Sequence, residues 1–172
     1  MRTIIITIFT LLLFSCHEDN VINVKLGDRY NGGTVFYIFK EDDIFYIPNE
    51  THGLIAYEKD TISIWANESI LVNGDERIGG GEINNQEIMN KSTISAALLC
   101  YSLGKGWYLP NQKELSALSD KRLLLSNLKQ GLYWSSTNGK ETYEGVAVNV
   151  YTNGYGNVKR NEKLLVRPIK QF

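Results

Sequence analysis

The sequence predicts an α+β fold that combines antiparallel sheets with two main helices. β-Branched and aromatic residues are concentrated near the start, in residues 34–39, and again near the end, in residues 145–151. Between these segments, apolar residues recur at largely helical spacing over residues 84–103. The chain therefore reads as strands, then helices, then strands.

The first strands follow a pair of glycines. Gly32 and Gly33 precede residues 34–39, which we expect to form one strand of a hairpin. A polar turn then leads to residues 44–47, which we expect to form the other strand. Residues 52–57 are a candidate for a further strand.

The middle of the chain predicts two helices. Residues 84–103 have the spacing of one long helix, and Gly104 is suited to end it. Residues 73–81, just before it, are rich in Gly, Asn and Asp and are expected to be a loop. Asn111 followed by Glu114 has the spacing of a capping box, which predicts a second, shorter helix.

The last third of the chain returns to strand patterns. Residues 132–136, 145–151 and 164–167 each have a strand-like composition. Asn153 and Gly154 form the dipeptide most typical of a tight hairpin. We therefore expect an antiparallel sheet to close the domain.

The beginning of the chain is typical of a secretion signal. Arg2 supplies one positive charge, and residues 4–14 are an almost unbroken apolar run. That run is shorter than the roughly 18 apolar residues that a membrane-spanning helix needs. Residues 1–15 are therefore predicted to be a signal peptide and residues 16–25 a lipidated Cys with its tether.

The four residues that end at Cys16 read Leu-Phe-Ser-Cys and resemble the lipobox of bacterial lipoproteins. The resemblance implies cleavage before Cys16 and attachment of acyl chains, such as palmitate, to this residue. The acyl chains on Cys16 would insert into the membrane, so membrane lipid is the expected partner of this residue. More than one acyl chain gives stable anchoring. Glu18 and Asp19 look like an acidic export tag, which implies the outer membrane and display at the cell surface; an ordinary polar tether is the alternative.

Residues 26–172 are expected to form one domain. The whole chain has a net charge of -1, and the part after the signal carries no excess of Lys and Arg. Nucleic acid is therefore not an expected partner. Once Cys16 is lipidated, Cys100 has no disulfide partner, and its apolar surroundings predict a buried free thiol.

Five segments, in order, resemble the motifs of the Lcl C-terminal domain family. This resemblance extends over nearly all of the chain after the signal and implies a C-type lectin-like fold, akin to the sulfatase-modifying-factor branch. It also implies a surface protein or adhesin that binds a polysaccharide or a protein. The segments are residues 27–37, 52–56, 107–115, 133–136 and 166–169.

Six residues stand out as the structural signature of this resemblance. We expect the large aromatic residues among them to lie in the core. We expect the arginine to pair with a carboxylate or with carbonyl groups inside the fold. The six residues are Gly32, Gly33, Trp107, Pro110, Trp134 and Arg167.

The candidate ligand-binding residues lie in the loops and strands of the last third. Tyr and Asn side chains offer contact area and adaptable hydrogen bonds at low entropic cost. Ordinary solvated turns are the alternative, and a binding face diversified by a retroelement is a further one. The candidates are Tyr143, Asn149, Tyr151, Asn153, Tyr155 and Asn157.

Enzyme, metal and cofactor functions find little support in the residues. The oxidase chemistry known for this fold needs two thiols, and only Cys100 is available. A serine hydrolase would have to use His52, and its Gly-x-Ser-x-Gly motif is missing. The acidic residues 41–43 read as a solvated turn, so we expect no metal and no cofactor.

Three hypotheses for function follow. The first is a displayed, non-catalytic binding or adhesion domain whose ligand is a glycan or a protein. The second is a structural component of an outer-membrane assembly. The third is an enzyme, whose activity would depend on His52 or Cys100.

Overall fold

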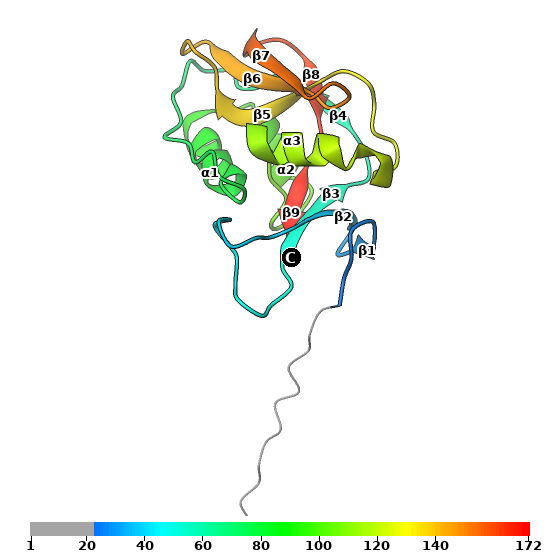
Figure 1. Cartoon of the computed structure of the whole chain (residues 1–172). Coiled ribbons are helices and arrows are strands. Elements are labelled where there is room, and N and C mark those ends of the chain that lie inside the picture. Colours follow the sequence, from blue (N-terminus) through cyan, green and yellow to red (C-terminus); the bar gives the residue numbers. More distant parts are fainter. Residues whose placement is uncertain (1–22) are drawn as a thin grey trace, which may run out of the picture.

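The computed structural model describes residues 23–172 (Figure 1). The predicted signal peptide, Cys16 and most of the predicted tether lie outside the described residues. The described part has an α+β fold with two sheets and short helices, which confirms the predicted fold class.

The smaller sheet has four antiparallel strands in the order β1-β2-β3-β9. It joins the beginning of the described chain to its end, because β9 pairs with β3. The predicted strand over residues 52–57 is confirmed as β3. The strands are β1 (Arg29–Tyr30), β2 (Gly33–Ile38), β3 (Gly53–Tyr57) and β9 (Ile169–Gln171).

The larger sheet has five strands in the order β4-β8-β5-β6-β7. It is a mixed sheet, because β5 and β8 run parallel where Tyr133 pairs with Leu165. The expectation that the closing sheet is wholly antiparallel is therefore wrong. The strands are β4 (Thr61–Ser63), β5 (Leu132–Asn138), β6 (Glu144–Asn149), β7 (Gly154–Lys159) and β8 (Leu164–Val166).

The hairpin predicted around Asn153 and Gly154 is confirmed between β6 and β7. Asn149 pairs with Gly154, so the turn consists of residues 150–153. Asn153 takes the left-handed conformation with φ 57°, which asparagine tolerates well. Tyr155 belongs to the strand and not to the turn.

The prediction of one long helix is wrong, because two helices occupy that region. These are α1 (Gly81–Lys91) and α2 (Ala96–Tyr101). Between them, the Ser92 hydroxyl donates to the Asn67 side chain at 2.6 Å and to the Ile94 carbonyl at 2.9 Å. Ser95 then caps the second helix by accepting from the Leu98 N–H at 3.2 Å. Local side-chain bonds thus replace the helical ladder.

The helix predicted from Asn111 is confirmed as α3 (Gln112–Asp120). Its capping box is complete: the Asn111 side chain accepts from the Glu114 N–H at 2.9 Å, and the Glu114 carboxylate accepts from the Asn111 N–H at 2.7 Å. A short 3₁₀ turn, Arg122–Leu124, follows.

The hairpin predicted between residues 34–39 and 44–47 is wrong. β2 pairs with β3 instead, and residues 44–47 contain no strand. The Lys40 N–H donates to the Asp43 carboxylate at 2.7 Å, which makes the turn. The Ile44 N–H then bonds to the Ile78 carbonyl at 3.2 Å. The segment is therefore held against the loop before α1 and not against β2.

The core is divided by the sheets into three groups of buried side chains. α3 packs Leu115 and Leu118 between the two sheets, against Phe36 and Tyr133. α1 and α2 cover the other face of the larger sheet, around Trp134. A third group lies around Val35, Ile55 and Trp107 on the outer side of the smaller sheet.

A buried ion pair joins the two sheets. Arg167 follows β8 and is 1 % exposed; its Nε donates to Asp60, in the connection from β3 to β4, at 2.6 Å. Nη1 donates to the Tyr57 carbonyl at 2.6 Å, and Nη2 donates to the Asn127 carbonyl at 2.9 Å. The other Asp60 oxygen accepts from the Tyr133 hydroxyl at 2.7 Å. The predicted pairing of Arg167 with a carboxylate and carbonyl groups is confirmed.

Replacing Arg167 by methionine should therefore destabilise the protein strongly. The change leaves the Asp60 carboxylate buried without its counter-ion, which costs about 3–5 kcal/mol. Urea unfolding of the Arg167→Met variant measures this loss. The exposed pair Arg29–Glu58 provides the control, because Arg29→Met should change the free energy of unfolding by less than about 1 kcal/mol. Equal effects of the two changes would contradict the structural role of Arg167.

Candidate functional site

The signature glycines and proline lie at positions where the backbone constrains the residue type or makes a buried contact. Gly32 has φ 88°, a conformation that glycine adopts without strain. A Cβ on Gly33 would lie 2.6 Å from the Ala56 carbonyl oxygen, so the two strands could not approach as they do. Pro110 is buried, and its carbonyl accepts from the Ser136 N–H at 2.7 Å.

The two signature tryptophans are buried, as predicted. Trp134 is fully buried, and its indole N–H donates to the Ser63 carbonyl at 3.1 Å. Trp107 packs edge-on against Tyr57 with ring centroids 5.1 Å apart. Both residues therefore serve the fold and not a ligand.

The six predicted ligand residues are spread along the β6–β7 pair, with Asn157 opposite Val146 in its middle and the others nearer its two ends. Glu144 pairs with Lys159 at one end, and Asn149 pairs with Gly154 at the other. The five intervening steps span about 17 Å at roughly 3.4 Å per residue. The candidates do not form one compact site.

The group at the hairpin end consists of Asn149, Tyr151, Asn153 and Tyr155. Asn149 is used by the turn, since its side chain accepts from the Tyr151 N–H at 3.0 Å. The Tyr151 hydroxyl donates to the Leu128 carbonyl at 3.1 Å. Tyr155 is 66 % exposed and shares a face of the sheet with its partner Val148. Tyr155 therefore offers its ring to solvent at this end.

The other group contains Tyr143 and Asn157. Tyr143 is 53 % exposed, and its carbonyl accepts from the Arg160 N–H at 3.0 Å. The Asn157 side chain accepts from the Lys140 N–H at 3.2 Å, which ties β7 to the loop before Tyr143. This end of the sheet is thus built from the β5–β6 loop and the end of β7.

A cavity of about 260 Å³ opens beside Tyr143. We call it the Arg160 cavity. Its wall combines the end of β7 with the segment that follows Trp65, and most of its side chains are polar. The lining residues are Ala66, Asn67, Glu68, Ser69, Tyr143, Lys159, Arg160 and Asn161.

Arg160 is the most unusual residue of this wall. It is 3 % exposed, and its guanidinium carbon lies over the Trp65 ring, 4.0 Å from the centroid. Nε donates to the Glu144 carbonyl at 2.8 Å and Nη2 donates to the Asn138 side chain at 3.3 Å. Nη1 is buried and has no hydrogen-bond partner among the described residues. Burial lowers the pKa of Arg160 to about 10, so the group is still charged at neutral pH.

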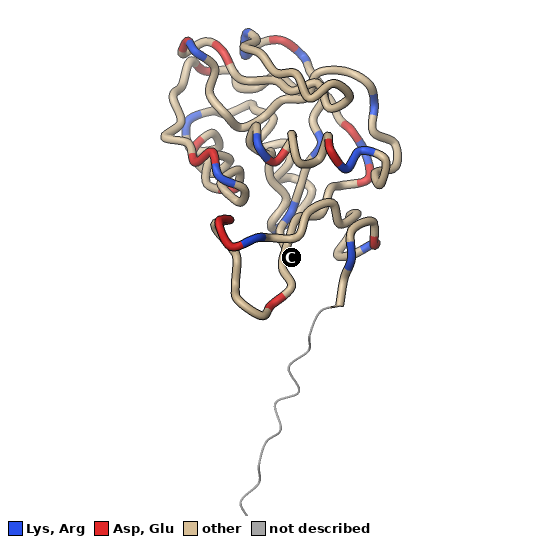
Figure 2. The backbone as a smooth tube through the Cα atoms, in the orientation of Figure 1, with Lys and Arg blue, Asp and Glu red and all other residues tan. Residues whose placement is uncertain are grey.

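The charge around the cavity is mixed. Lys159 and Glu68 are exposed residues on its rim. Positive and negative residues are also scattered together over the described backbone as a whole (Figure 2). The buried guanidinium is therefore a local feature and not part of a broad basic surface.

Two other hollows have polar groups that are already used. One of about 420 Å³ is mostly apolar and includes Phe45, His52 and Phe172. The ring nitrogens of His52 lie 2.7 Å from a Glu50 oxygen and 3.1 Å from the Phe172 carbonyl. One of about 310 Å³ includes Asp60, whose carboxylate is paired with Arg167.

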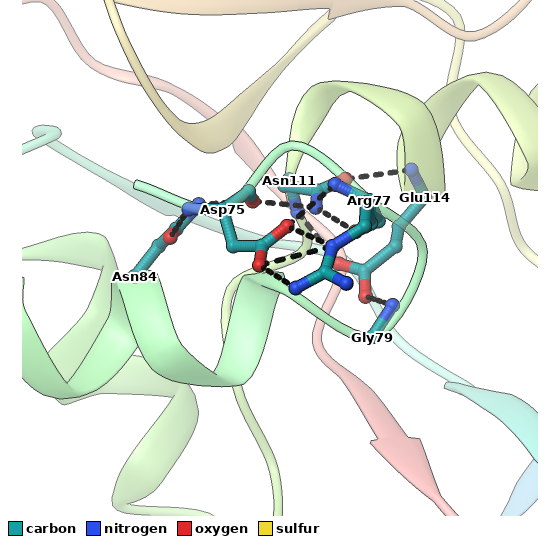
Figure 3. A network of polar contacts seen from close by, with 6 residues as sticks. All are labelled: Asp75, Arg77, Gly79, Asn84, Asn111 and Glu114. Atoms are coloured by element: carbon teal, nitrogen blue, oxygen red, sulfur yellow. Dashed lines mark hydrogen bonds and ion pairs between the residues drawn. The ribbon is translucent and has the colours of Figure 1, made fainter. Parts of the chain in front are cut away.

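A buried polar network fixes the loop before α1 (Figure 3). The Glu114 carboxylate is fully buried and accepts from the Gly79 N–H at 2.9 Å and from the Tyr108 hydroxyl at 3.1 Å. The Asn111 side chain donates to the Arg77 carbonyl at 2.7 Å. The Asn84 side chain accepts from the Asp75 N–H at 2.7 Å. Since the carboxylate has no exposed surface, the network serves the fold.

The thiol of Cys100 lies in the core. Cys100 is a free, fully buried thiol, as predicted, and burial raises its pKa. Among residues 23–172, three or more His, Cys, Asp or Glu residues are nowhere grouped to hold a metal ion. No helix between residues 23 and 172 has the length and apolar character to span a membrane.

No family model matches the chain, and no curated protein matches it.

The sequence reasoning missed Arg160 and Trp65. Trp65 lies between the predicted strands of the first half and the loop before α1, far from Arg160 in the chain. The available signal was the pair Lys159-Arg160, two basic residues of which the first ends β7 and the second follows it directly. Burial of the second residue depends on a contact that the local pattern does not contain.

The Glu114 carboxyl should make stability depend on pH. Burial raises its pKa from 4.5 to about 7, so the folded protein binds this proton more tightly than the unfolded chain. The stabilisation that comes from this tighter proton binding is complete below pH 4.5, the pKa of the carboxyl in the unfolded chain. It is lost as the pH rises to about 7, and the free energy of unfolding falls by at most roughly 1.4 kcal/mol per pH unit. Urea unfolding of the wild type and of Glu114→Gln across this range isolates the contribution.

The Glu114→Gln variant should be less stable in acid and should lose this part of the slope. The exposed Glu141 supplies a control, since Glu141→Gln should keep the wild-type slope. An identical pH dependence in wild type and Glu114→Gln would show that the carboxyl titrates normally.

Proposed function

We propose that the protein is a cell-envelope lipoprotein that displays a non-catalytic, lectin-like binding domain at the bacterial surface. Cys16 carries the lipid, and the domain binds a glycan or a protein ligand. Its binding face runs along the exposed edge of the larger sheet, from the turn between β6 and β7 to the loop that contains Tyr143. We call this edge the outer end of the sheet.

The arrangement of the two ends of the domain carries this proposal. β7 lies at the far side of the domain from residue 23, where the described chain begins and to which Cys16 is joined through the tether (Figure 1). A domain that is anchored through its N-terminal side would present β6 and β7 away from the membrane. This is the orientation that a displayed binding domain needs.

The chemistry of the outer end also supports the proposal. Tyr143 and Tyr155 are more than half exposed, and Tyr151 is 43 % exposed. Tyrosines with two rotatable torsions lose little entropy when they bind. The backbone of Tyr155 is held in β7, whereas Tyr143 and Tyr151 lie in loops whose backbone is hydrogen-bonded to Arg160 and to Asn149. Exposed aromatic rings on a rigid support are suited to contact a ligand.

The resemblance to the Lcl C-terminal domain family supports the same reading. Its signature residues lie at structural positions: Gly33 and Pro110 at close backbone contacts, Trp107 and Trp134 in the core, and Arg167 in the buried ion pair. The resemblance adds an expectation of a C-type lectin-like fold and of surface adhesion. The residues of the outer end are then free to vary with the ligand.

Replacing an exposed tyrosine should weaken binding without unfolding the protein. The whole chain, purified in detergent micelles, is applied to an array of bacterial and host glycans and to an array of envelope and matrix proteins. We expect a saturable ligand, with affinity about tenfold lower for Tyr143→Ala or Tyr155→Ala, because interface tyrosines are frequent hot spots.

Two further variants sharpen this experiment. Tyr101 is 52 % exposed on α2, so Tyr101→Ala is a matched control that should bind normally. Cys16→Ala should release the protein from the membrane fraction of cells. The alternative is a structural component of an envelope assembly. It would be favoured if no array ligand were found, if the tyrosine variants behaved like the wild type, and if crosslinking in cells always captured the same neighbouring proteins.

A further inference from the structure

We infer that the Arg160 cavity binds a carboxylate-bearing sugar, such as a terminal uronic acid, whose carboxylate neutralises Arg160. This inference rests on the proposed function and names the ligand class for one end of the proposed binding face.

The two fully buried arginines of the larger sheet differ in their counter-ions. Arg167 is paired with Asp60, and its donors reach carbonyl groups. Arg160 is 3 % exposed, yet it forms no ion pair with any carboxylate of residues 23–172. Buried charges in proteins are ordinarily paired, because an unpaired charge is costly to remove from water. The fold thus holds one buried cation that it does not neutralise.

The free donors of Arg160 define what can neutralise it. Its contacts with Glu144 and Asn138 use Nε and one N–H of Nη2, which leaves the second N–H of Nη2 and both of Nη1. The contact with Trp65 and the two hydrogen bonds hold the guanidinium in place. Adjacent N–H groups on a fixed plane match the two oxygens of a carboxylate.

The rest of the wall favours a sugar as the carrier of the carboxylate. Tyr143 is half-exposed at the rim and offers a ring face and a hydroxyl group. Ser69 and Asn161 are exposed and bring further polar groups suited to sugar hydroxyls. About 260 Å³ is slightly below the range of roughly 300–1,000 Å³ that drug-sized ligands occupy, so the cavity suits one terminal residue of a chain.

Binding through Nη1 requires a movement of the cavity wall. Nη1 has no solvent-exposed surface, so a carboxylate reaches it only after a neighbouring side chain turns aside. Such side chains change rotamer within nanoseconds. Glu68 carries the same charge as the ligand, whereas Lys159 carries the opposite charge. Removing the charge of Glu68 should therefore strengthen binding of the carboxylate, and removing the charge of Lys159 should weaken it.

The test compares matched oligosaccharides that end in glucuronic acid or in glucose. Binding to the whole chain in detergent micelles is measured by calorimetry, with arginine side-chain ¹⁵N signals followed in parallel. We expect the acidic sugar to bind at least about tenfold more tightly, and the Arg160→Lys variant to lose this preference. The Arg160 Nη signals should shift on binding, whereas those of Arg167 should not.

Two exposed variants keep the test independent of folding. Lys159→Gln should weaken binding of the acidic sugar by about two- to fivefold, and Glu68→Gln should strengthen it by a similar factor. Equal binding of both sugars, unaffected by these changes, would overturn the inference while leaving the proposed function intact. Loss of stability in the unliganded Glu68→Gln variant would also overturn the inference, because Glu68 would then be the counter-ion of Arg160.

Discussion

The ion pair between Arg167 and Asp60 is the interaction on which the rest of the structure depends. It lies where the chain passes from the smaller sheet to the larger one, and it also binds carbonyl groups before β4 and before β5. Because the charges neutralise each other inside the fold, the two sheets and α3 can enclose a dry core between them. The position of β5, and therefore of β6 and β7 beside it, follows from this junction.

The outer end of the larger sheet is built differently. β7 is an edge strand, and its exposed residues include Tyr155, Asn157 and Lys159. Arg160, directly after it, is buried against Trp65 but has no carboxylate partner among the described residues. Polar groups that satisfy one another serve stability, whereas a buried donor without a partner in the protein needs another explanation, and for Arg160 we assign it to a ligand. The two arginines thus separate the structural part of the domain from the part that we assign to binding.

The sequence predicted elements whose signal is local. The capping box of Asn111 and Glu114, the Asn153-Gly154 hairpin and the strand that became β3 were all found, because their residues act on their own neighbourhood. The predictions of one long helix and of a hairpin with residues 44–47 were wrong, because contacts with distant residues decide these structures. Ser92 bonds with Asn67 and interrupts the helix, and residues 44–47 bind the loop before α1. The candidate site shows the same limit. The tyrosines could be identified, but the burial of Arg160 could not.

The most direct measurement is the free energy of unfolding of Arg160→Met without any ligand. If Arg160 is kept for a ligand, its removal takes away an unneutralised buried charge, and stability should stay within about 1 kcal/mol of the wild type or rise. The lost stacking on Trp65 and the lost contact with Glu144 limit the gain. A loss of roughly 3–5 kcal/mol would instead show that Arg160 is a structural residue neutralised within the protein, and it would contradict the account.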